Sequence, residues 1–131
     1  MARELMKYLI DTNLFLYAAA NDQKVVAFFD TAQDSEWAGF SSITRLELFG
    51  FPDLKPGDES KLAALLGCFS ELPVTSDVVD RAIAIRRERR MKAPDAIIAA
   101  SALVMNAHLA TRNTSDFKNI KGLHLENPFK G

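Results

Sequence analysis

Short apolar segments alternate with longer helical ones along the chain, and this alternation limits the fold more than any other feature. Apolar runs predict strands at residues 8–10, 37–41 and 108–111, with shorter ones just before Pro73 and at residues 123–125. Strands that alternate with helices form a mostly parallel sheet, because each helix returns the chain to the edge where the next strand starts. The sequence therefore predicts the α/β class.

Helical periodicity fills the intervals between these strands. The predicted helices lie at residues 13–20, 25–29, 44–49, 61–69, 78–90 and 95–106. The last of them is apolar on nearly every face, so it is predicted to be the central buried helix. Chain breakers at residues 51–58 predict a loop. With 131 residues, 48% of them hydrophobic, and no linker, we expect a single domain spanning residues 1–131.

Four carboxylates lie where predicted strands end or predicted helices begin. Asp11 follows the first strand, Glu47 lies in the helix after the second, and Asp116 follows the late strand. Asp95 comes directly after Pro94 in the first turn of the apolar helix. The carboxyl ends of parallel strands share one edge, so one crevice could hold all four acids. Such a repulsive cluster needs a cation, and Mg²⁺ and Mn²⁺ prefer carboxylate oxygens.

Each acid also has a purely structural explanation. Asp11 could cap the helix that follows it, and Asp116 could be a turn residue. Thr44 and Glu47 have the spacing of a capping box, Thr-x-x-Glu. Asp95 is an anion in a first helical turn, where the helix dipole favours it. The functional interpretation rests on all four lying at the same end of the predicted sheet.

The helix predicted at residues 78–90 ends in a basic run. Sixteen basic and 17 acidic residues leave a net charge of −1, so only a local patch can attract nucleic acid. The cations of this run could complement the helix dipole on a solvated face. Alternatively, Arg86, Arg90 and Lys92 could contact RNA phosphates beside Asp95. The residues of the run leave both explanations open.

Several other functions are disfavoured. The single Cys68 excludes an internal disulfide and is expected to be buried. His108 and His124 lie in apolar strand contexts, which makes histidine base catalysis a weak hypothesis. A phosphate-binding glycine-rich loop is absent. An aspartyl-phosphate phosphatase needs a second Asp two positions after the first, where this chain has Asn13.

We expect no signal peptide and no membrane-spanning segment in this sequence. Its longest apolar stretch, residues 96–105, is interrupted by Ser101. That stretch is well short of the roughly 20 residues that cross a bilayer. We therefore expect a cytoplasmic protein without a membrane partner.

Four segments together resemble the PIN domain, and most closely the small toxin ribonucleases of VapC type. They are Asp11-Thr12-Asn13 after an apolar strand, Glu47 within residues 43–48, Asp95 within residues 92–100, and Thr111-Arg112-Asn113 with Asp116-Phe117. The likeness covers nearly the whole chain in order. Residues 1–5 precede the usual start of the family and are expected to form a loose N-terminal extension, with Met6 as an alternative initiation site.

The resemblance implies a PIN-like fold, a central parallel sheet of four or five strands flanked by helices. It implies an endoribonuclease that depends on Mg²⁺ or Mn²⁺, in which Asp11, Glu47, Asp95 and Asp116 match the acidic quartet. In our hypothesis Asp11 and Asp95 hold the principal ion, and Asp116 and Glu47 complete its shell or hold a second one. Secondary polar positions of the family match a further set, Asn13, Thr111 and Asn113.

The resemblance also implies two protein partners, a second copy of the chain and a small antitoxin that covers the acidic site. Residues 13–29 carry more apolar side chains than one small core needs, which agrees with a partner surface. Three alternatives remain. They are a housekeeping PIN nuclease in RNA maturation, a non-catalytic RNA- or protein-binding module, and a phosphate-accepting signalling domain, for which Glu47 has no evident use.

Overall fold

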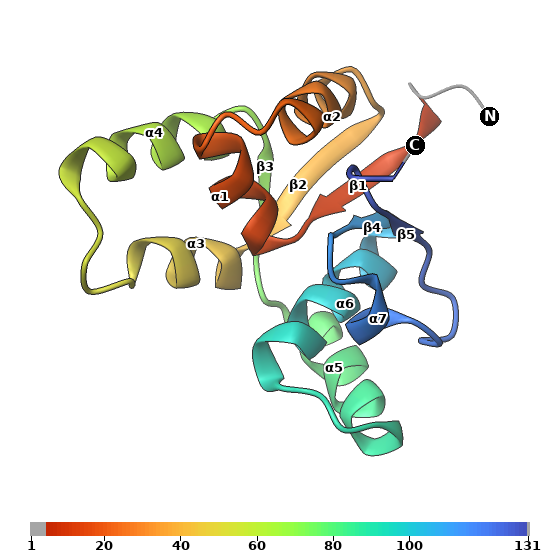
Figure 1. Cartoon of the computed structure of the whole chain (residues 1–131). Coiled ribbons are helices and arrows are strands. Elements are labelled where there is room, and N and C mark those ends of the chain that lie inside the picture. Colours follow the sequence, from red (N-terminus) through yellow and green to blue (C-terminus); the bar gives the residue numbers. More distant parts are fainter. Residues whose placement is uncertain (1–4, 131) are drawn as a thin grey trace.

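The computed structural model describes residues 5–130, which form a five-stranded parallel sheet with helices on both faces (Figure 1). The strands are β1 (Lys7–Ile10), β2 (Trp37–Ser41), β3 (Ser70–Leu72), β4 (His108–Ala110) and β5 (Leu125–Glu126). Their order across the sheet is β3-β2-β1-β4-β5, so the first strand is the central one. The predicted parallel α/β sheet is confirmed. The expected N-terminal extension lies outside the described residues, apart from Leu5.

The helices form two layers. In chain order they are α1 (Thr12–Ala19), α2 (Gln23–Gln33), α3 (Ser42–Phe49), α4 (Pro56–Leu66), α5 (Ser76–Glu88), α6 (Ala93–Met105) and α7 (Thr114–Phe117). Figure 1 shows α1 and α2 on one face of the sheet, and α5 and α6 on the other. The connections β1–α1, β2–α3 and β4–α7 all leave the sheet at the carboxyl ends of their strands. Three of the four acids belong to these connections or to the helices that follow them.

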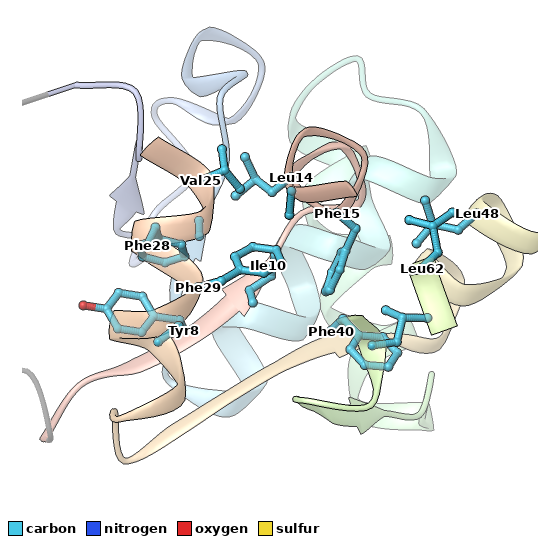
Figure 2. Packing of buried hydrophobic residues seen from close by; sticks show 14 residues of the cluster. Tyr8, Ile10, Leu14, Phe15, Val25, Phe28, Phe29, Phe40, Leu48 and Leu62 are labelled. Carbon is cyan, nitrogen blue, oxygen red and sulfur yellow. The ribbon is translucent and has the colours of Figure 1, made fainter. Parts of the chain in front are cut away.

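The central strand divides the core in two because its side chains alternate between the faces. Tyr8 and Ile10 pack with α1, α2 and α4, whereas Leu9 packs with α5 and α6. The first cluster is rich in aromatic side chains (Figure 2). Phe15 is fully buried there, with its ring centroid 5.2 Å from that of Phe29 and 5.7 Å from that of Phe40. The second cluster contains most of α6, which confirms the prediction of a central buried helix.

The six predicted helices begin one to five residues earlier than the sequence indicated, and two of these differences bear on the argument. Helix α3 begins at Ser42, two residues earlier than expected, because the Ser41 hydroxyl accepts a hydrogen bond from the Ile43 N–H at 3.1 Å. Thr44 therefore lies inside the helix, and the capping-box explanation for Glu47 is wrong. Helix α4 begins at Pro56, within the stretch predicted as a loop, because proline suits the first turn of a helix.

Two further differences lie near strand ends. The short helix α7 was not predicted, because four residues carry too little periodicity to signal a helix. Cys68 is exposed, so the expected burial is wrong. It lies in the turn after α4, where the neighbouring Leu66 and Phe69 face the core in its place. Within residues 5–130, no helix combines the length and the apolar character needed to span a bilayer.

Truncating Phe15 tests the importance of the aromatic cluster. We expect Phe15→Ala to lower the free energy of unfolding by about 3–5 kcal/mol, because a buried ring is removed and the space cannot fully close. The adjacent Leu16 is 49% exposed, so Leu16→Ala should cost less than about 1 kcal/mol. Urea unfolding followed by circular dichroism compares the two variants with the parent chain. Equal losses for both would show that the cluster does not carry this stability.

Candidate active site

Asp11 is the most enclosed acid of the four, with only 6% of its surface exposed. It directly follows β1 and caps α1, and its Oδ1 accepts a hydrogen bond from the Thr12 N–H at 2.8 Å. Its Oδ2 accepts from the Thr111 hydroxyl, also at 2.8 Å. The Asp11 N–H donates to the Ala110 carbonyl at 2.9 Å, which ties the end of β1 to the end of β4. Both carboxylate oxygens are thus fixed by groups from two neighbouring strand ends.

Glu47 is joined to this arrangement through a pair of threonines. The Thr12 hydroxyl donates to Glu47 Oε1 at 2.7 Å. The hydroxyl oxygens of Thr12 and Thr44 are 2.8 Å apart. Because a hydroxyl has one hydrogen, and Thr12 gives its own to Glu47, Thr44 is the donor to Thr12. Thr12 and Thr44 are buried, and together they hold the side chain of the exposed Glu47 near Asp11, which Thr12 directly follows.

The electrostatics link all four acids. Burial raises the pKa of Asp11 to about 6, against the lowering effect of its hydrogen bonds from Thr111 and Thr12. The charges of Asp95 and Glu47 raise this pKa further. Burial also raises the pKa of Asp95, as does the charge of Asp116. Repulsion therefore runs from Glu47 to Asp11, from Asp11 to Asp95, and from Asp95 to Asp116.

The donor chemistry of the four acids fits a hard divalent cation. All the candidate ligands are carboxylate oxygens, and their mutual repulsion is the kind that a cation relieves. In the part of the chain that the structure describes, no three Asp, Glu, His or Cys side chains form a ready metal cage. Glu47 and Asp116 are exposed and Asp95 is half-buried, so these side chains have room to rotate toward an ion beside Asp11.

The predicted polar positions have different surroundings. Thr111 is fully buried and donates to Asp11, whereas Asn113 caps α7 and gives its backbone N–H to the Thr111 hydroxyl at 3.0 Å. Asn13 is exposed on the first turn of α1. Only Thr111 has a side-chain contact with an acid of the quartet among the hydrogen bonds described for these three. It is the polar residue that orients Asp11.

The basic run is less uniform than its sequence suggests. Arg86 Nε donates to the Met91 carbonyl at 3.0 Å and so closes the turn between α5 and α6. Arg90 and Lys92 are exposed. The Lys92 charge lowers the pKa of Asp95, which places this lysine near the acidic edge. The run therefore contains at least one arginine with a structural contact.

Four contacts could not be predicted from the sequence. The Thr12–Thr44 pair carries only a weak signal, since both threonines stand beside acids of the quartet but 32 positions apart. Arg112 donates to the Tyr17 hydroxyl at 2.8 Å and lies over the Phe129 ring, 4.2 Å from its centroid. No local pattern joins residues so distant along the chain. The rings of His108 and His124 stack with their centroids 5.3 Å apart. His108 is the first residue of β4, so it lies at the opposite end of that strand from Thr111.

Comparisons with known proteins agree on one family. The family model described as the PIN domain matches residues 8–123. A chain in the structure of VapBC2 from Rickettsia felis, bound to a promoter DNA fragment, is 27% identical with a TM-score of 0.84, over 93% of this chain and 98% of that one. A toxin–antitoxin complex from Klebsiella pneumoniae contains a chain 29% identical, with a TM-score of 0.76, over 95% and 99%.

A third similar structure is FitAcB from Neisseria gonorrhoeae. Its matching chain is 26% identical with a TM-score of 0.74, over 95% of this chain and 99% of that one. No curated protein matches the sequence. The shared length in all three structures means that the likeness extends over nearly the whole chain rather than one motif.

Neutralising Asp11 is expected to stabilise the metal-free protein. The pKa of Asp11 in the folded protein, about 6, exceeds the ordinary 3.8, so folding favours the protonated carboxyl. The stability that the protonated form contributes is complete below pH 4 and is lost as the pH rises through 6. At pH 8, Asp11→Asn should raise the free energy of unfolding by roughly 1–3 kcal/mol, since one pKa unit is worth about 1.4 kcal/mol. Urea unfolding in EDTA at pH 4 and pH 8 measures this gain.

The control for this measurement is Asp30→Asn, which changes an exposed carboxylate on α2. It should leave stability at both pH values within about 0.5 kcal/mol of the parent chain. If Asp11→Asn destabilised the protein at pH 8, the repulsion assigned to Asp11 would be contradicted.

Proposed function

This chain belongs to the PIN-domain family, a family of nucleases, and on that premise we propose that it is a metal-dependent endoribonuclease. We propose further that it is the toxin of a toxin–antitoxin pair, working in the cytoplasm as a single PIN domain over residues 1–131. The observation that carries the proposal is the chain of repulsion among Glu47, Asp11, Asp95 and Asp116 at the carboxyl edge of the sheet. A fold gains nothing from such repulsion unless a cation balances it.

The proposed ion, Mg²⁺ or Mn²⁺, would be held principally by Asp11 and Asp95. Asp116 and Glu47 would complete its shell or hold a second ion. A divalent ion in such a place lowers the pKa of its water, orients the phosphate and neutralises developing charge. The chain's own part is to present the four carboxylates at one edge of the sheet. Buried Asp11 supplies the rigid ligand, and the other three are adjustable.

The hydroxyl contacts support this assignment. Thr111 occupies one lone pair of Asp11 Oδ2, which leaves its remaining lone pairs for a cation. Thr12, itself steadied by Thr44, holds Glu47 on the same side of α1. Metal sites commonly need such groups, which hydrogen-bond to the residues that ligate the metal and so fix their orientation. Asn113 acts on Thr111 through its backbone, and Asn13 lies exposed one residue beyond Thr12.

The substrate we propose is single-stranded or looped RNA, whose backbone can enter a crevice more easily than a duplex can. Arg90 and Lys92 are exposed beside the helix that carries Asp95, and they are the best placed cations of the basic run for phosphate contacts. Arg86 is the weaker candidate, because its Nε is bound to the Met91 carbonyl.

The proposed protein partners are an antitoxin and a second copy of the chain. The similar structures from Rickettsia felis and Klebsiella pneumoniae are a VapBC2 assembly and a toxin–antitoxin complex, which supports the first partner. A groove of about 620 Å³ between α3 and α4 is lined by Leu46, Phe49 and Ala63. Leu46 is 65% exposed, and such an apolar surface suits an amphipathic segment of another protein. The same observations favour a toxin over a housekeeping nuclease.

Cleavage of RNA tests the proposed activity. Purified, antitoxin-free protein should cut total cellular RNA into discrete fragments with Mg²⁺ or Mn²⁺, but not with EDTA. Asp95→Asn should slow cleavage by about 100-fold or more, a barrier increase of roughly 3 kcal/mol. The exposed Asp53→Asn is the matched control and should cleave at the parental rate. Cleavage that persists in EDTA and in Asp95→Asn would refute the proposed mechanism.

The phosphate contacts are tested separately. The double variant Arg90→Gln with Lys92→Gln should raise KM for RNA and lower the slope of log Kd against log salt by about 0.7 for each phosphate that is no longer neutralised. The value of kcat should change little, because neither residue belongs to the acidic quartet. Lys55→Gln with Lys130→Gln removes the same charge from exposed positions elsewhere and serves as control. An unchanged KM in the first variant would favour a purely solvated basic run.

A further inference from the structure

Helix α7, which carries Asp116, is too short to be stable by itself. Helix α7 has four residues, and Asn113 at its start makes no side-chain capping bond. An isolated helix of this length is unstable in water, because nucleation costs more than one turn returns. Of its side chains only Phe117 is buried. The location of the exposed Asp116 carboxylate therefore depends on contacts from elsewhere in the fold.

Arg89 makes those contacts. It follows the last residue of α5, where the backbone turns extended, with φ −157° and ψ 154°. Its Nη1 donates to the Lys118 carbonyl at 2.6 Å, and its Nη2 donates to the Asp116 carbonyl at 3.2 Å. Carbonyls at the end of a helix lack partners within the helix, and a cation there also complements the helix dipole. One guanidinium thus bridges the two residues on either side of Phe117.

Arg89 differs from its neighbours in the basic run. Its side chain is half-buried, and its Nε is buried without a hydrogen-bond partner among the described residues. Its two terminal nitrogens donate to one carbonyl within α7 and to one at the residue that follows α7. Arg90, Lys118 and Lys121 line an adjoining cavity of about 370 Å³ and remain exposed to solvent. A role in holding the backbone therefore fits Arg89 better than a role in binding phosphate.

We propose that Arg89 is a positioning residue that anchors α7 to α5 and so keeps the Asp116 carboxylate beside Asp95. The proposal rests on the proposed metal-dependent function for its purpose, although the anchor itself is a property of the fold. Helix α5 packs on α6, which carries Asp95 in its first turn. Arg89 therefore sets the position of Asp116 against the same layer that presents Asp95. Since the two carboxylates repel each other, an unanchored α7 would move outward.

The test compares Arg89→Met with Arg89→Lys, and uses Arg87→Met as the matched control, since Arg87 is exposed near the end of the same helix. Hydrogen exchange of the backbone amides of residues 114–118 is measured in EDTA, and Mn²⁺ affinity is measured by calorimetry. We expect Arg89→Met to exchange at least about 10-fold faster in α7 and to bind Mn²⁺ about 10–100-fold more weakly. Arg87→Met should match the parent chain in both.

The kinetic readout separates positioning from RNA binding. With RNA as substrate, Arg89→Met should lower kcat and leave KM unchanged. Arg89→Lys should recover part of the loss, because an ammonium keeps the charge but lacks the planar fork that spans two carbonyls. It also serves as the test variant if Arg89→Met does not fold. A raised KM with parental Mn²⁺ affinity would make Arg89 an RNA contact and overturn the proposal.

A double-mutant cycle shows whether Arg89 acts through Asp116. If it does, Arg89→Met should weaken Mn²⁺ binding in the parent chain but have little further effect in Asp116→Asn. Additive effects would overturn the proposal, as would unchanged exchange in α7. If the parent chain bound no metal and cut no RNA, the proposed function would fail. The exchange measurement in EDTA would still decide whether Arg89 anchors α7.

Discussion

The buried carboxylate of Asp11 is the constraint around which the rest of the molecule is arranged. It follows the central strand, and the hydrogen bonds that fix it come from the backbone of the next residue, at the start of α1, and from the hydroxyl that follows the neighbouring strand β4. Those bonds hold its position but do not offset its burial, and its pKa stays high. Burying the ionised carboxylate of Asp11 therefore costs folding free energy that its hydrogen bonds do not offset. Sites under such tension are where function is commonly found.

The two faces of the sheet contribute differently to this edge. On one face, interlocking rings around Phe15 make a stiff support for α1 and hence for Asp11 and Thr12 (Figure 2). On the other face, α6 is packed largely through alanines, which lets it lie close to the sheet and present Asp95 at its first turn. One layer fixes the buried Asp11, and the other carries Asp95, which is only half-buried.

The parallel sheet could be predicted from the sequence because it depends on local patterns, and the proposal of four acidic site residues starts from the same patterns. Apolar strands such as residues 8–10 are evident from their composition. Asp11 stands at a strand end and Asp95 at a helix start, whereas Glu47 lies in the last turn of α3. The contacts that orient those acids could not be reached, since Thr12 meets Thr44, and Arg89 meets Lys118, only after folding. Charge alone could not distinguish Arg86 and Arg89, which bind backbone carbonyls, from exposed Arg90.

The strand order has a consequence for how the molecule comes into being. The central strand is made first, yet one of its two neighbours in the sheet, β4, begins only at residue 108. A chain that stops before residue 108 therefore leaves one edge of β1 without its partner strand. The hydroxyl that steadies Asp11 arrives with that late strand, and Asp116 five residues after it. A chain that stops before residue 111 thus lacks both the hydroxyl that orients Asp11 and the Asp116 carboxylate.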